Sequence, residues 1–442
     1  MAPTIVTAGP FAPPKVPRRR YFGQDWAAKD SRSLNMGVLA KARLGSAYTL
    51  TGGVFRSSFR NEQNFAELFV GTTADGLTRE QVIADPGQNY ASTSGELQIS
   101  RIFAEGPQLH ALHATVRARQ VESRYGGAAP ALNLGPRWLD EWVPISRPDR
   151  FALSEQTHDQ VRQVTVGAAY EGRWRDVGEV SLGIQRKTID LPGALATAWD
   201  AERPWLANGA AAVHLSKALA LHAGRTRGLE ESGLAPASAA NRNAALPAIR
   251  TTQSDAGVRW TVSPRLKLVA GVFDIRKPYF NTDEANVYTV LGDVRHRGVE
   301  LSLSGAPTDA ISLVAGAVLI KPRVTGAAVE LGRVGERPLG QPTAVVRGNL
   351  EYRPPAWRGF SVDLAAAYPG RRPSSRDNLA WLPAYGVLDI GARYRFRIGD
   401  APATLRLQVA NVTNSYAWSV SGSNSYGLMD RRRALAFLVV DF

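Results

Sequence analysis

Alternation of apolar and polar residues is clearest in the last forty residues of the chain. The segment 403–409 alternates small or apolar residues with polar ones, and the segment 434–442 is mostly apolar and ends on an aromatic residue. A period of two places successive side chains on opposite faces of a strand. Both segments therefore predict strands, and an edge strand of a soluble sandwich is the alternative interpretation. Their apolar faces would carry Leu405, Leu407, Val409, Leu438, Val440 and Phe442.

The same period continues toward the N-terminus, which makes an all-β fold the expected class. Val180, Leu182 and Ile184 alternate with polar or small residues, and the segment 299–303 repeats the pattern. Runs of this kind recur from about residue 33 onward, and they predict about seventeen strands.

Connection lengths favour a barrel over a sandwich. Short turns such as 44–46 and 105–107 alternate with long connections such as 61–90 and 124–159, without a break along the chain. Outer-membrane barrels place short turns on the periplasmic side and long loops outside. Closure also removes the strand edges that bilayer hydrocarbon does not tolerate. The pattern predicts an antiparallel transmembrane β-barrel whose apolar positions face lipid.

Aromatic residues near the predicted strand ends support this membrane placement. Such residues form girdles at both membrane interfaces of a barrel. The candidates are Tyr48, Tyr170, Trp174, Trp260, Tyr352, Trp357, Tyr385 and Tyr394.

Composition excludes several classes of function. The chain has no cysteine, so disulfides, thiolate metal sites and cysteine nucleophiles are absent. Lys and Arg number 53 against 39 Asp and Glu, a net charge of +14, but the arginines are spread out and no nucleic-acid-binding pattern occurs. We therefore expect no nucleic-acid partner. No apolar run is long enough for a membrane-spanning helix.

The N-terminal part differs from the rest of the chain. Residues 1–32 are rich in proline and arginine and show little periodicity, so we expect a loop there and a barrel over residues 33–442. The first ten residues have neither the basic region nor the apolar stretch of a signal peptide. An odd number of strands that ends in the periplasm begins outside the cell. Residues 1–32 are then expected to be the remnant of an extracellular loop.

Four segments resemble TonB-dependent outer-membrane receptors of the siderophore-receptor type. They are 279–283, 291–303, 382–394 and 405–414, the last together with terminal Phe442. They occur in the order expected for that family, and the resemblance covers essentially the whole chain.

The resemblance implies a plugged barrel of about 22 strands in the outer membrane of a Gram-negative bacterium. Such receptors import siderophore-like iron chelates with energy from the TonB complex. Compared with that pattern, the sequence lacks a secretion signal, a plug domain and about five strands, so we expect a truncated C-terminal part of a barrel. The segment 4–8 looks like the short box that contacts TonB, but it precedes a barrel strand, and we interpret it as a chance similarity. Phe442 resembles the terminal aromatic residue that family members present to the barrel-assembly machinery.

Transport needs no catalytic group, and we expect neither an enzyme nor a cofactor. The sequence has no phosphate-binding glycine loop, serine elbow or zinc-binding helix motif. His110 and His113 lie on opposite faces of a strand, which makes them poor joint metal ligands. Arginine and aromatic side chains suit a large anionic iron chelate. The candidate ligand-binding residues, all in predicted loops, are Arg124, Tyr125, Trp138, Trp142, Phe280, Arg372, Trp381, Trp418 and Tyr426.

Other functions stay open on the sequence alone. A passive porin or structural barrel would conduct ions without TonB, and a truncated chain can also be a non-functional fragment. An outer-membrane hydrolase needs a serine–histidine–acid cluster near one rim, and none of the histidines sits there. The sequence does not name the ligand, because loop chemistry is adaptable and a fold does not determine a substrate.

Overall fold

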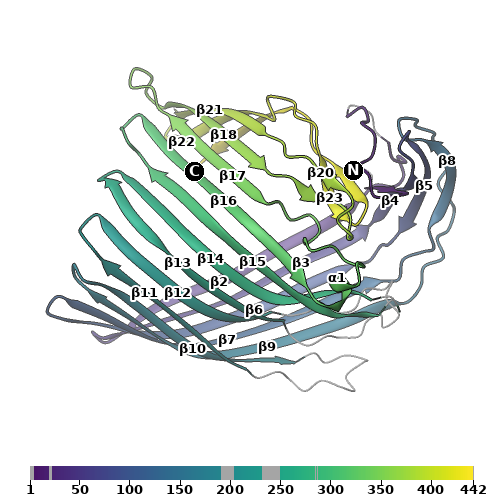
Figure 1. Ribbon diagram of the computed structural model, residues 1–442. Helices are drawn as coiled ribbons and strands as arrows, with labels where there is room; N and C mark the ends of the chain where they lie inside the picture. The colour runs from purple at the N-terminus through teal and green to yellow at the C-terminus, as the bar shows by residue number, and fades with distance from the viewer. Residues whose placement is uncertain are drawn as a thin grey trace.

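The computed structural model describes residues 4–18, 22–190, 204–230, 249–283, 285 and 287–441. Within these residues, seventeen strands form one barrel-shaped antiparallel sheet, as the alternation predicted. Figure 1 shows them slanting side by side around a curved wall. The barrel strands are β2 (Asp30–Leu44), β3 (Tyr48–Gln63), β6 (Asn89–Glu105), β7 (Gln108–Gly126), β9 (Gln156–Trp174), β10 (Gly178–Asp190), β11 (Trp205–His214), β12 (Leu219–Glu230), β13 (Ile249–Ser263), β14 (Leu266–Thr282), β15 (Tyr288–Gly305), β16 (Ile311–Thr325), β17 (Ala344–Tyr352), β18 (Phe360–Pro369), β21 (Val387–Ile398), β22 (Ala401–Ala410) and β25 (Arg433–Val440).

Residue pairings join these strands in sequence order. β2 pairs with β3, each following barrel strand pairs with the next, and β22 pairs with β25. Short turns connect alternate pairs, and Gly45 and Gly106 adopt φ angles of 63° and 58° in two of them. Positive φ is the conformation for which glycine is favoured in tight hairpins. The predicted alternation of short turns with long connections is confirmed.

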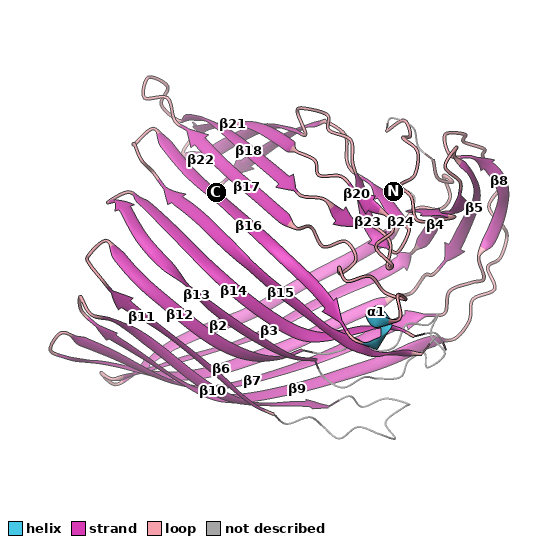
Figure 2. Cartoon of the chain, in the orientation of Figure 1, coloured by secondary structure: helices cyan, strands magenta, loops and turns pink. Residues whose placement is uncertain are grey.

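The long connections hold a second sheet, which the sequence interpretation missed. Its spatial order is β23-β24-β1-β4-β5-β8, and we call it the loop sheet. Figures 1 and 2 place it at the end of the wall opposite the short turns. Its strands are β1 (Thr4–Thr7), β4 (Phe65–Thr72), β5 (Leu77–Ala84), β8 (Leu132–Trp138), β23 (Trp418–Gly422) and β24 (Ser425–Leu428).

Smaller elements complete the long connections. β19 (Arg372–Pro373) pairs with β20 (Trp381–Leu382), and α1 (Ala327–Glu330) is a single helical turn after β16. Among the described residues, no helix has the length and apolar character needed to cross a membrane.

The structure corrects the sequence interpretation at the N-terminal segment. Residues 1–32 were expected to be a loop, but Thr4–Thr7 forms β1, and β2 begins at Asp30. β1 pairs in parallel with β4 and antiparallel with β24. The first four residues of segment 4–8, whose sequence looks like a TonB-contacting box, are therefore part of the loop sheet.

Exposure alternates along the barrel strands in agreement with a lipid-facing outer surface. Leu182 and Ile184 are about half exposed, whereas Ser181 and Gly183 are less so, and Leu301 is 46% exposed. Paired residues on neighbouring strands share a face of the sheet. This alternation assigns one face of the wall to lipid and the other to the lumen, as predicted for Val180, Leu182 and Ile184.

Aromatic residues collect on the lipid-facing side near the short turns. Tyr48 begins β3, Trp260 lies near the end of β13, Tyr352 ends β17, and Tyr394 pairs with Phe360 at the start of β18. These strand ends all lead into or out of short turns. Tyr and Trp side chains favour such a membrane interface, because their rings are amphipathic and lie at the level of the lipid headgroups. Tyr385, by contrast, lies in the long connection before β21.

The larger buried clusters lie in the loop sheet. One contains Ile5, Phe69, Leu382, Trp418 and Tyr426. Another contains residues of β4, β5 and the neighbouring connections. The loop sheet therefore has its own apolar core, which holds the long connections together at one mouth of the barrel.

Candidate functional site

Three of the predicted ligand-binding residues meet inside the loop sheet. Tyr426 is fully buried, and Trp418 and Arg372 are nearly so. Arg372 Nη2 donates a hydrogen bond to Trp418 O at 2.5 Å, and the Arg372 guanidinium lies 5.2 Å from the centroid of the Tyr385 ring. The Tyr426 hydroxyl donates to Phe11 O at 2.9 Å. These residues are part of the packed interior of the mouth, because they are buried and the Arg372 Nη2 and Tyr426 hydroxyl groups donate to backbone carbonyls of other segments.

Trp381 presents a different environment at the edge of the same region. Its indole Nε1 donates to Asn378 O at 2.9 Å, and the ring is half-buried. The exposed guanidinium of Arg371 lies 5.3 Å from the ring centroid. The sequence interpretation selected Arg372 and missed Arg371, although alternation along the extended backbone directs neighbouring side chains to opposite sides.

Trp138 and Trp142 lie near the far edge of the loop sheet, and both are exposed. Trp138 is the last residue of β8, where it pairs with Leu77 of β5. The Trp142 indole donates to Gly23 O at 2.8 Å, which fixes the ring orientation, and 41% of the residue remains exposed. These two side chains are available to a ligand approaching from outside.

The other candidates lie in barrel strands and not in loops, which corrects the sequence interpretation of their place. Arg124 and Tyr125 belong to β7 and pair with His158 and Thr157 of β9. Phe280 belongs to β14, and its ring centroid lies 6.3 Å from that of Tyr288 on β15. None of these three is part of the loop sheet. Phe442 lies outside the described residues.

A buried polar network in the loop sheet was missed by the sequence interpretation. Gln24 is almost fully buried, and its side-chain Nε2 donates to Glu80 Oε1 of β5 at 3.0 Å. The backbone N–H of Gln24 donates to Glu67 Oε1 of β4 at 2.5 Å. Glu80 also forms a buried ion pair with Arg137 of β8. The network fastens the segment 22–27 onto three strands of the loop sheet.

Burial in this network changes the pKa of Glu67. Loss of solvent raises the pKa of the Glu67 carboxyl above its usual value near 4.5, and the negative charge of Glu80 raises it further. The hydrogen bond from the Gln24 backbone acts in the opposite direction. One signal for Glu67 was available in the sequence, since it interrupts the otherwise apolar face of Phe65 and Phe69.

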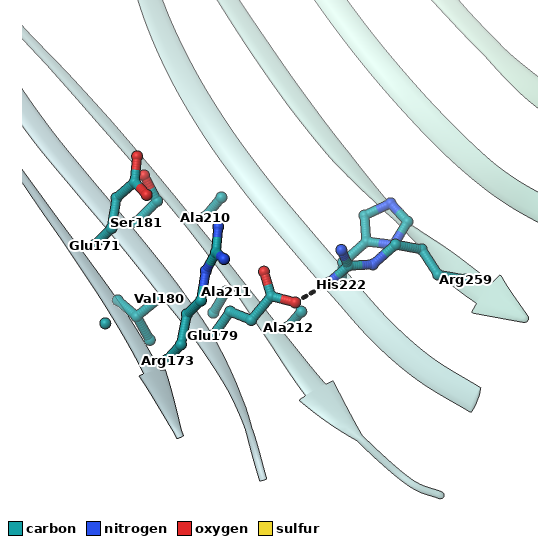
Figure 3. Close-up of a pocket in the computed structure, with 11 residues that line it drawn as sticks. Glu171, Arg173, Glu179, Val180, Ser181, Ala210, Ala211, Ala212, His222 and Arg259 are labelled. Atoms are coloured by element: carbon teal, nitrogen blue, oxygen red, sulfur yellow. Dashed lines mark hydrogen bonds and ion pairs between the residues drawn. The ribbon is translucent and has the colours of Figure 1, made fainter. Parts of the chain in front are cut away.

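The lumenal face of β9–β13 carries a second polar cluster, shown in Figure 3. Arg259 Nη2 lies 3.3 Å from Glu179 Oε1, and Arg173 and His222 line the same cavity of about 340 Å³. Both partners of the ion pair are substantially exposed, so the pair contributes little to stability. The cavity shows that charged residues line the lumenal wall, as expected where the outer face meets lipid.

His110 and His113 of β7 have different hydrogen-bond partners. His110 Nδ1 lies 2.8 Å from the Tyr170 hydroxyl, whereas His113 Nδ1 lies 2.8 Å from Ser100 Oγ. The prediction that the two face opposite sides of β7 is confirmed by these different partners. Within the described ranges, no group of three or more His, Asp or Glu side chains is arranged to hold a metal ion.

A barrel wall with an apolar outer face, and long connections gathered into a sheet at one mouth, define an outer-membrane β-barrel receptor. The chain belongs to the family described as TonB dependent receptor-like, beta-barrel, whose model matches residues 4–414. This membership confirms the predicted family and the outer-membrane location, and the family consists of transport receptors and not of enzymes.

Individual receptors resemble the chain over different lengths. The ferrichrome receptor FcuA of Yersinia enterocolitica is 30% identical over 197 residues, which are 44% of this chain and 26% of the receptor. The ferric preacinetobactin receptor BauA of Acinetobacter baumannii superposes with a TM-score of 0.81 at 17% identity, covering 100% of this chain and 67% of BauA. The siderophore receptor PiuA, also of Acinetobacter baumannii, gives 0.77 at 14% identity, covering 97% of this chain and 68% of PiuA. The chain thus spans about two thirds of these solved receptors, and its match to FcuA covers about a quarter of that protein.

Proposed function

We propose that the chain forms the barrel and external loops of a TonB-dependent transporter for a siderophore-like iron chelate. The family match over residues 4–414 is the observation that carries this proposal. Receptors similar in sequence or fold are named for ferrichrome, ferric preacinetobactin and ferric catecholate, which are all iron chelates.

The proposed ligand contacts are three accessible members of the predicted set together with Arg371, which the prediction did not include. Arg371 and the half-buried Trp381 offer a cation beside an aromatic ring, and Trp138 and Trp142 offer exposed indoles. A guanidinium and aromatic faces suit an anionic chelate with planar catecholate-type donors. Arg372, Trp418 and Tyr426 would then position this surface from beneath, while Arg124, Tyr125 and Phe280 stay predictions on the wall.

The partners follow from the same proposal. The TonB complex would supply energy, membrane lipid would surround the apolar outer face, and the barrel-assembly machinery would recognise Phe442. Residues 4–18 and 22–29 would lie outside the cell, since β1 belongs to the loop sheet.

Binding of ferric chelates tests the proposal on the purified chain. Quenching of tryptophan fluorescence is titrated with a ferric tris-catecholate and a ferric trihydroxamate. Arg371→Gln is expected to weaken binding of the anionic tris-catecholate by about fivefold, the cost of one cation contact of roughly 1 kcal/mol. Trp357→Phe is the matched control, because Trp357 is exposed in the short turn between β17 and β18 at the opposite end of the barrel. Absence of binding by either chelate, or equal effects of both variants, would count against the proposal.

A further inference from the structure

The connection between β8 and β9 carries one of the proposed ligand contacts and directly follows another. Trp138 ends β8, Trp142 lies in the connection, and nearly half of each residue is exposed. Residues 139–155 contain no helix or strand, so sheet pairing does not hold this segment. A ligand-binding side chain keeps one orientation only when neighbouring groups support it. The orientation of the two indoles therefore depends on the contacts of this segment with other parts of the mouth.

The segment 22–27 supplies such contacts. Gln24 Nε2 donates a hydrogen bond to Val143 O at 3.0 Å, and the backbone N–H of Ile145 donates to Gln24 Oε1 at 2.9 Å. Trp26 Nε1 donates to Ile145 O at 2.8 Å. These side-chain hydrogen bonds fasten the backbone of residues 143–145, and Gln24 contributes to it on both the donor and the acceptor side.

The same segment also orients the Trp142 ring. Its Nε1 donates to Gly23 O at 2.8 Å. Gly23 is buried, and a Cβ atom there would overlap the carboxylate of Glu67. The backbone N–H of Gln24 donates to this carboxylate at 2.5 Å. The hydrogen-bond acceptor of the indole is therefore held in place by β4.

Gln24 is fixed in turn by β5 and β8. Its Nε2 also donates to Glu80 Oε1 at 3.0 Å, and Glu80 forms a buried ion pair with Arg137. Arg137 directly precedes Trp138, and its Nη1 donates to Val143 O at 3.3 Å. Only 1% of Gln24 is exposed. One buried amide thus connects the groups that anchor both indoles.

We propose that Gln24 is a positioning residue for the chelate, which holds the segment 137–145 so that Trp138 and Trp142 meet the ligand in one preformed orientation. The proposal rests on the proposed function, because these two indoles are among its ligand contacts. Gln24 is buried and touches no ligand itself. Side chains that are ordered before binding lose less conformational freedom on binding, which strengthens the affinity.

An amide has the hydrogen-bonding groups that this position requires. It offers two N–H donors and an oxygen acceptor, whereas an ionised carboxylate only accepts. Gln24 donates to Glu80 and Val143 and accepts from Ile145. Gln24→Glu would therefore keep the size of the side chain, lose both donated bonds and place a further negative charge beside Glu80.

Binding of a ferric tris-catecholate to the purified full chain, followed by tryptophan quenching, tests the proposal. Gln24→Ala and Gln24→Glu are each expected to weaken binding by roughly tenfold, because the lost hydrogen bonds loosen the segment. Gln156→Ala is the matched control, since the Gln156 amide also bonds one connection to another, at Pro86 O, but lies outside the segment 137–145. Normal binding by Gln24→Glu would show a space-filling role and overturn the proposal, as would an equal loss in Gln156→Ala.

A double-mutant cycle separates positioning from a general loss of structure. In a chain that already carries Trp138→Ala and Trp142→Ala, Gln24→Ala is expected to cost little further affinity, because the side chains through which it acts are gone. Trp381 remains in this chain as a fluorescence reporter. An undiminished effect of Gln24→Ala in that chain would overturn the proposal, since the effect would then reach the ligand by another route.

Hydrogen exchange measures the segment without any ligand. Gln24→Ala removes the acceptor of the Ile145 N–H, so residues 139–145 are expected to exchange faster than in the unaltered chain or in Gln156→Ala. Unchanged exchange in Gln24→Ala would overturn the proposal whether or not a chelate binds. Failure of the unaltered chain to bind either ferric chelate would instead overturn the proposed function, and faster exchange would still show that Gln24 holds the segment.

Discussion

Gln24 donates a hydrogen bond to Glu80 across 56 residues of sequence, at 3.0 Å. Through this contact the segment before the first barrel strand becomes part of the loop sheet. The Gln24 side-chain oxygen also accepts from the backbone N–H of Ile145, at 2.9 Å. One buried amide thus connects the N-terminal segment, β5 and the connection after β8, and it makes the mouth of the barrel a single packed unit.

Gly23 is a position at which one substitution would disrupt this unit. A Cβ atom at Gly23 would overlap the buried carboxylate of Glu67. Gly23→Ala is therefore expected to destabilise the packed segment by about 1–3 kcal/mol, the usual cost of overpacking. Limited trypsin digestion checks this, with faster cleavage after Lys29 as the expected result. Gly386→Ala is the control, since a Cβ there meets no atom within 4 Å; equal cleavage of the two variants would show that Gly23 is not tightly enclosed.

The raised pKa of Glu67 predicts that the packed segment 22–27 is more stable in mild acid than at neutral pH. Below the usual value near 4.5 the carboxyl is protonated in both the folded and the unfolded segment. As the pH rises above that value, the unfolded segment releases its proton first, so the folded segment loses stability until the folded pKa is passed. Hydrogen exchange of residues 22–27, corrected for its intrinsic pH dependence, is expected to show weaker protection at neutral pH than near pH 5. Burial also raises the pKa of Glu80, which accepts from the Gln24 side chain. Glu67→Gln should therefore reduce this dependence in part, and a variant with unchanged dependence would assign the effect to another group.

The sequence predicted the barrel better than its mouth, for a physical reason. Alternation at 299–303 reports a local property, since each residue must face either lipid or lumen. β24 has no such alternation, and its partner Ile5 lies more than 400 residues away from Tyr426. Its strand conformation comes from tertiary pairing and burial, which a local pattern does not contain.

For the candidate ligand-binding residues, too, the local sequence was informative where tertiary pairing and packing were not involved. Phe280 was predicted in a loop, yet β14 continues through it because Val290 of β15 offers a paired partner. Two of the aromatic candidates, Trp381 and Trp418, lie in the long connections at the mouth. Arg371 is exposed and Arg372 is buried. This difference depends on the packing of the folded chain and is not visible in the sequence.

The absence of cysteine gives a direct test of membrane orientation. Leu331 lies in the long connection after β16, and Val177 lies in the short turn after β9; both are exposed. In intact cells, a membrane-impermeant maleimide is expected to label Leu331→Cys and not Val177→Cys. After outer-membrane permeabilisation both should react. The reverse pattern in intact cells would invert the assignment of long connections to the outside.

The assignment of faces predicts that an arginine destabilises the barrel more at a lipid-facing position than at the neighbouring lumenal position. Leu301 faces lipid, whereas Ser302 faces the lumen. Leu301→Arg is expected to lower the free energy of unfolding in vesicles by about 2–4 kcal/mol, the cost of a cation near the middle of the bilayer. Ser302→Arg should cost much less, because its side chain enters the lumen. Denaturant unfolding of both variants gives the comparison, and equal losses would contradict the assigned faces.

Uptake of a radiolabelled ferric siderophore tests the proposed transport most directly. The chain is expressed in cells that lack their own siderophore receptors, with TonB either present or deleted. Iron is expected to accumulate only when both the chain and TonB are present. Equal accumulation with and without TonB would make the chain a passive pore, and no accumulation in either strain would contradict transport by this chain.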